Sequence, residues 1–120
     1  MQGNESIRIV KHEESLRSVQ HRGVRMRVLY EDERLEIVNS EMEPHSSLEF
    51  DYSGDFSAFH LVLEGSPLLE GKDRIEGLLP GDSVYLPDGT GHRISNPASS
   101  RSVIWTLLEK KERPSNGGGL

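Results

Sequence analysis

Two histidines, His60 and His92, stand in short β-like runs of the sequence, at 58–64 and 91–96. A neutral imidazole near pH 7 can give or accept a proton, so such a pair could act as the acid and base of a reaction. The other three histidines lie in polar or turn-like stretches and are expected at the surface. His60 and His92 are therefore the candidate catalytic residues.

The composition narrows the other chemistry open to this chain. It contains no cysteine, so disulfides, thiolate catalysis and cysteine-based zinc sites are excluded, and any metal would need His, Asp or Glu ligands. A net charge of −6 argues against binding to nucleic acid. No apolar run approaches the roughly 20 residues that cross a bilayer, and the start lacks the features of a signal peptide. A cytoplasmic location without membrane contact is the expectation.

The elements that must position the two histidines are short strands. From Gly23 onward apolar and polar residues alternate with period two, and turn residues recur at intervals that are typical of a sandwich or barrel. A helix, or only a turn, is expected at 12–20, and residues 7–10 are a candidate strand. The predicted organisation is an N-terminal extension at 1–22, a barrel at 23–110 and a flexible tail at 111–120. The expected strands are 24–28, 35–39, 48–52, 58–64, 82–86, 91–96 and 102–108.

The most specific pattern in the chain runs from Gly81 to Asn96 and reads GDSVYLPDGTGHRISN. It can be written G-x5-P-x-G-x2-H-x3-N. Gly81 suits a turn with positive φ, Pro87 ends a strand, and Gly89 permits a tight reversal. His92 then opens the next strand and can point into a barrel.

This pattern resembles the second signature motif of the cupin superfamily at every fixed position. The resemblance implies an all-β fold, the double-stranded β-helix or jelly-roll barrel, with a pocket at its mouth. It also implies that the motif histidine, here His92, is a metal ligand. The stretch from 59 to 92 further resembles the sensor cupins of arabinose-regulator-type transcription factors, which bind small effectors. We expect no helix-turn-helix pair in this sequence, so DNA binding does not carry over with the resemblance.

The first cupin motif is degenerate in this chain. Its closing glycine fits Gly65, but the position of its glutamate holds Ala58, and Ser53 and Asp51 hold those of its two histidines. With the shorter spacing the histidine positions hold Gly54 and Tyr52. A working site needs about three protein ligands, so a divalent ion (Fe, Mn, Zn or Ni) would require a substitute set. The candidate metal ligands are His60, His92 and Asp51.

The alternation of strand residues predicts which side chains line the pocket. Asp51 is expected to face inward with Glu49, and a one-residue slip would reverse this assignment. A mixture of apolar walls and a few polar groups suits a small organic ligand. The predicted ligand-binding residues are Asp51, Ala58, His60, Val62, Tyr85, His92 and Ile94.

Three functions stay open from the sequence. The first is a small-molecule binding cupin, which could also be a metal-independent isomerase or cyclase using His60 and His92. The second is a metal-dependent oxygenase, lyase or isomerase using these histidines with Asp51. The third is a stand-alone ligand-sensing module. A homodimer is expected in each case, as in other small cupins, and residues 7–10 are a candidate for strand exchange.

Overall fold

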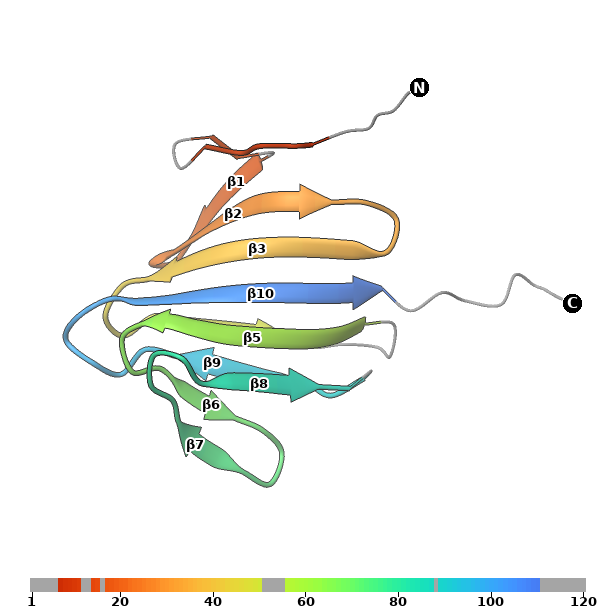
Figure 1. Ribbon diagram of the computed structural model, residues 1–120. Helices are drawn as coiled ribbons and strands as arrows, with labels where there is room; N and C mark the ends of the chain where they lie inside the picture. Colours follow the sequence, from red (N-terminus) through yellow and green to blue (C-terminus); the bar gives the residue numbers. More distant parts are fainter. Residues whose placement is uncertain (1–6, 12–13, 16, 51–55, 88, 111–120) are drawn as a thin grey trace, which may run out of the picture.

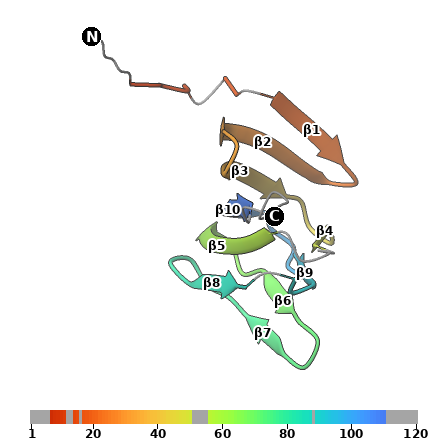
Figure 2. The same ribbon diagram turned by 90° about the vertical axis from the view of Figure 1, so that its right-hand side faces the viewer.

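The computed structural model describes residues 7–11, 14, 15, 17–50, 56–87 and 89–110, and these form two antiparallel sheets. The large sheet has the strand order β1-β2-β3-β10-β5-β8, and the small sheet has the order β4-β9-β6-β7. The two sheets face each other (Figure 1, Figure 2). The strands are β1 (Arg17–His21), β2 (Val24–Glu31), β3 (Leu35–Met42), β4 (Ser47–Phe50), β5 (Phe56–Glu64), β6 (Leu68–Glu70), β7 (Ile75–Gly77), β8 (Ser83–Leu86), β9 (His92–Ser95) and β10 (Ser102–Lys110).

The all-β prediction is confirmed, whereas two details near the N-terminus are wrong. Residues 7–10 form no strand, and the second half of the predicted helix at 12–20 is strand β1. The cause is the tight turn at Arg22 and Gly23, whose φ angles are 49° and 85°. Two consecutive positive φ angles mark a type I′ hairpin, so the residues before the turn must pair with β2. His21 accordingly lies opposite Val24. No helix in the described residues is long and apolar enough to cross a membrane.

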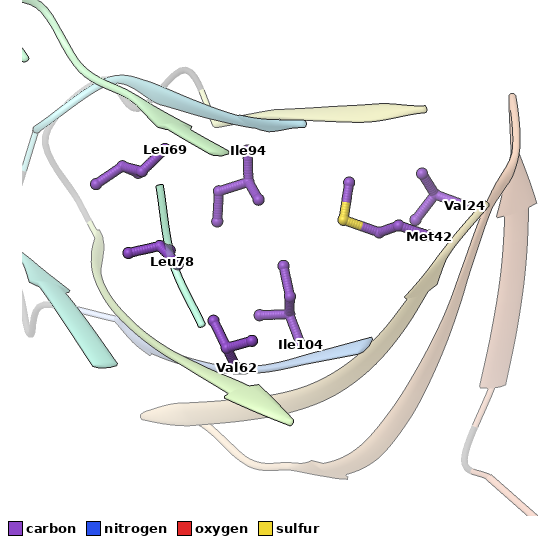
Figure 3. Packing of buried hydrophobic residues seen from close by; sticks show 7 residues of the cluster. All are labelled: Val24, Met42, Val62, Leu69, Leu78, Ile94 and Ile104. Carbon is purple, nitrogen blue, oxygen red and sulfur yellow. The ribbon is translucent and has the colours of Figure 1, made fainter. Parts of the chain in front are cut away.

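The core lies between the two sheets (Figure 3). Val62 on β5 and Ile104 on β10 point from the large sheet toward Ile94 on β9 and Leu69 on β6. Each of these four side chains is at most 7% exposed. The hydrophobic effect of this buried apolar surface is the main force that closes the two sheets on each other. Val24, Met42 and Leu78 complete the cluster.

The Gly81–Asn96 motif has the local structure that its residue types predict. Gly81 has a φ of 94°, which residues other than glycine rarely adopt. The chain turns there into β8, which ends at Leu86, and β9 then begins at His92. The motif therefore forms two strands of opposite sheets and delivers His92 to the barrel interior, where it is 7% exposed.

Candidate functional site: a buried histidine pair beside an apolar cavity

His60 and His92 meet inside the barrel, although 32 residues separate them in the sequence. Their Nε2 atoms are 2.9 Å apart, which is a hydrogen-bond distance. The other ring nitrogen of His60, Nδ1, lies 2.8 Å from Oγ1 of Thr106 on β10. Nδ1 of His92 lies 3.1 Å from the carbonyl oxygen of Thr90. A continuous chain of hydrogen bonds thus runs from Thr106 through both histidines to Thr90.

Phe50 covers this pair from the small sheet. Its ring stacks on that of His92, with centroids 4.6 Å apart and an interplanar angle of 4°, and its centroid is 5.0 Å from that of His60. Strand pairing explains the stack, because Phe50 lies directly opposite His92 where β4 pairs with β9. Directly paired residues share one face of a sheet. The inward position predicted for Glu49 is therefore wrong: Glu49 is exposed, and Phe50 faces inward instead.

A cavity of about 220 Å³ opens next to the histidine pair. Thr106 and Phe50 form part of its wall, so they separate the cavity from the imidazole rings. Ser40 contributes the second hydroxyl group of the wall, and the charged side chains of Arg17 and Glu36 also line it, joined by an ion pair of 2.9 Å. The remaining wall is apolar and comes from β1, β2, β3 and β10: Val19, Met26, Val28, Val38 and Leu108.

The structure brings together some of the predicted site residues and not others. Ala58, His60 and Val62 all face inward on β5, as the alternation predicted. Val62 and Ile94 belong to the packed core rather than to the cavity wall. The inward orientation predicted for Tyr85 is wrong, because this side chain is 63% exposed. Asp51 lies outside the described residues.

Burial governs the ionisation of the pair. His60 is 0% exposed, and its loss of hydration, reinforced by the nearby His92, lowers its pKa from 6.5 to about 3. Burial also lowers the pKa of His92, although its hydrogen bond to the Thr90 carbonyl opposes this shift. Charging a group inside an apolar site is costly, so both imidazoles are neutral at pH 7.

The described residues do not fit a divalent ion. A metal site needs about three protein ligands, and no group of three His, Asp or Glu side chains is found in the part of the chain that the structure covers. The two histidine Nε2 atoms hydrogen-bond to each other, and the stacked neighbour of His92 is the phenyl ring of Phe50. A metal at this place would need a ligand from outside the described residues, and the role of Asp51 as such a ligand remains a prediction.

Two residues of the site, Phe50 and Thr106, are not among the predicted ligand-binding residues. Signals for both are present. Leu48 and Phe50 alternate with the charged Glu49, and this pattern favours the observed inward face. Thr106 stands between Ile104 and Leu108 on the inward face of β10, so it is a hydroxyl at a core position. Buried hydroxyl groups need hydrogen-bond partners, and His60 is that partner.

Two facing antiparallel sheets, with the histidine of the Gly81–Asn96 motif pointing between them, define a jelly-roll barrel of the cupin class. Comparison with solved structures confirms the cupin fold predicted from that motif. The sequence matches no protein-family model and no curated protein.

Three of the similar structures show how far the shared fold extends over this chain. An RmlC-like cupin from Shewanella frigidimarina has a TM-score of 0.75 and 16% identity, over 92% of this chain and 96% of that one. The cupin domain of an XRE family transcriptional regulator from Enterobacter cloacae has a TM-score of 0.70 and 15% identity, over 75% and 99%. KdgF from a Halomonas species has a TM-score of 0.70 and 15% identity, over 80% and 89%.

Proposed function

We propose that this protein binds a small, mostly apolar organic molecule in the cavity beside the histidine pair. The observation that carries the proposal is the cavity itself. Its volume of about 220 Å³ suits a molecule of one or two rings, and its wall is mainly aliphatic and aromatic, with two hydroxyl groups and the Arg17–Glu36 ion pair. Small-molecule sites commonly combine such apolar walls with a few polar groups that orient the ligand.

Binding is favoured over catalysis by the position of the histidines. An acid or base must come within hydrogen-bond reach of the reacting atom. His60 is fully buried and both of its ring nitrogens already have partners, so it cannot touch a ligand in the cavity. In this proposal His60 is a positioning residue for Thr106, and the protein is a binding or sensing module. The alternative function, a metal-dependent enzyme with Asp51 as a ligand, gains no support from the His, Asp and Glu side chains of the described residues.

Filling the cavity should weaken ligand binding. We use 2-methoxynaphthalene, an uncharged fluorescent probe of two rings, and titrate the protein into it while recording anisotropy. Val38 lines the cavity on β3. The larger ring in Val38→Phe should occupy the ligand's space and weaken binding by about tenfold or more, equivalent to about 1.4 kcal/mol. Leu63→Phe, on the exposed outer face of β5, is the matched control and should bind like the wild type. A wild-type protein that does not bind the probe would refute the proposal.

We further propose that the protein is a homodimer that pairs through the outer face of the large sheet. Tyr85, Phe59, Leu107 and Ile37 lie directly opposite one another across β8, β5, β10 and β3. Trp105 and Leu61 form the neighbouring row. Tyr85, Phe59 and Trp105 are at least 40% exposed. None of the four side chains in the first row is charged. A second copy of the chain, related by a twofold axis, could therefore cover this row without burying an unpaired charge.

The dimer is tested by mass in solution. Sedimentation equilibrium of the wild type should give twice the chain mass of 13.5 kDa. Phe59→Glu places a charge in the centre of the row and should give the monomer mass. Ile75→Glu makes a similar change at a more exposed apolar residue, on β7, and should leave the dimer intact. A monomeric wild type, or a Phe59→Glu variant that remains dimeric, would contradict the proposed interface.

A further inference from the structure

We infer that the cavity selects ligands that donate a hydrogen bond, such as phenols or other hydroxylated aromatic molecules. This inference rests on the proposed binding function and adds the chemical class of the ligand. It follows from the direction of the hydrogen bonds between Thr90, the two histidines and Thr106. That direction is fixed at one end by a backbone carbonyl group.

The chain begins at the carbonyl oxygen of Thr90, which can only accept. Nδ1 of His92 must therefore carry the proton and donate to it across 3.1 Å. A neutral imidazole has one N–H group, so Nε2 of His92 is an acceptor. Nε2 of His60 must then donate across the 2.9 Å that separate the two rings, because two acceptors would repel each other.

The same logic continues to the cavity wall. With its proton on Nε2, His60 has an acceptor at Nδ1, and the Thr106 hydroxyl must donate to it across 2.8 Å. The hydroxyl proton of Thr106 is thereby committed to His60, and only the oxygen lone pairs remain for a molecule in the cavity. Thr106 lines the cavity, so a bound ligand meets an acceptor at this point. A ligand that offers a carbonyl or ether oxygen there would face a repulsive contact.

The first test compares probes of similar size. Displacement or direct anisotropy titration should show that 2-naphthol binds about three- to tenfold more tightly than 2-methoxynaphthalene, the gain expected from one hydrogen bond. The acceptor-only 2-acetylnaphthalene should bind no more tightly than 2-methoxynaphthalene. Equal affinities of all three would overturn the inference and leave the proposed function standing. Absence of binding by all three would overturn the proposed function itself.

Variants of the cavity wall locate the acceptor. Thr106→Val removes the oxygen and should bring 2-naphthol down to the affinity of 2-methoxynaphthalene, while Thr106→Ser should retain the preference. Ser40→Ala removes the other wall hydroxyl and should also retain the preference. Loss of the preference in Ser40→Ala, with retention in Thr106→Val, would show that the acceptor is Ser40 and would refute the assignment.

The hydrogen-bond direction can be measured without any ligand or variant. Long-range ¹H–¹⁵N NMR spectra distinguish protonated from unprotonated ring nitrogens. At neutral pH they should show the Nε2–H tautomer for His60 and the Nδ1–H tautomer for His92. The opposite tautomer in either ring, or a protonated imidazolium, would reverse or break the chain and overturn the inference.

Discussion

Lowering the pH from 7.5 to 5 is expected to reduce the free energy of unfolding by about 2 kcal/mol through His60 alone. The pKa of His60 is about 3 in the folded protein and 6.5 as its ordinary value. Below pH 6.5 the unfolded chain therefore takes up a proton that the folded protein does not bind. Stability from this group is fully present above pH 6.5 and is lost as the pH falls toward 3. The lowered pKa of His92 has the same sign and adds to the loss.

Urea unfolding followed by circular dichroism at the two pH values measures this effect. The Asp32 carboxyl group does not interfere, because its pKa is lowered from 3.8 to about 2 and the pH range in which it titrates lies below pH 5. Among the described residues, the side chains in contact with His60 are those of His92, Thr106 and Phe50. Of these three, only His92 ionises in this pH range.

Two variants provide the controls. His60→Gln keeps a hydrogen-bonding side chain that does not titrate, and it should remove most of the pH dependence. His21→Gln replaces an exposed histidine, and this variant should keep the pH dependence of the wild type. If the wild type and His60→Gln lose the same stability between pH 7.5 and 5, His60 is not buried in the neutral form and the description of the pair is wrong.

Replacing Asn96 by alanine is expected to lower the free energy of unfolding by about 3 kcal/mol. Asn96 is fully buried, and its Nδ2 donates to the carbonyl oxygens of Met42, Glu43 and Ser100 at 2.9–3.2 Å. Its Oδ1 accepts a hydrogen bond from the Ala98 amide. The substitution would leave these backbone groups without their partner.

The loss should extend to the site because Asn96 also fixes β4. Its side-chain Nδ2 donates to the carbonyl oxygens of Met42 and Glu43, which lie where the chain leaves β3 toward β4, and these bonds are lost in the alanine variant. These bonds stand directly before the pairing of β4 with β9, which places Phe50 on His92. Asn96→Ala should therefore also weaken binding of 2-methoxynaphthalene under conditions where the variant is still folded.

Thermal and urea unfolding of three variants would test the role of this amide. Asn96→Asp retains the size but replaces the donating amide with a carboxylate facing three carbonyl oxygens, and it should be at least as destabilised as Asn96→Ala. Asn39→Ala makes the same change at another buried position, on β3, and should cost less than about 1 kcal/mol. A cost for Asn96→Ala as small as that for Asn39→Ala would contradict the structural role assigned to this amide.

Much of the fold was readable from local sequence features. The residue types at Gly81, Pro87 and Gly89 specify a strand, a turn and a second strand, and the predicted cupin fold is confirmed. Alternation also placed His60 and His92 on inward faces correctly. These features depend on neighbouring residues and on backbone preferences, so a sequence can display them directly.

Other features depended on which strands pair. Aligning residues 48–52 with the first cupin motif put Glu49 inward, yet β4 pairs with β9 so that Phe50 lies opposite His92. In a strand of four residues a shift by one reverses every side chain. The second half of the helix or turn expected at 12–20 is strand β1 for a related reason, since the turn at Arg22 and Gly23 makes pairing with β2 stronger than the weak helical pattern.

The sequence by itself determined that this protein is a cupin-type barrel with two inward histidines and a degenerate set of metal ligands. Only the tertiary structure decided that these histidines meet, that Thr106 connects them to a cavity and that Phe50 covers them. The reason is physical: β-strand periodicity fixes the face on which a side chain lies. The distance between side chains of different strands is set by register and by sheet packing, which involve residues far apart in the chain.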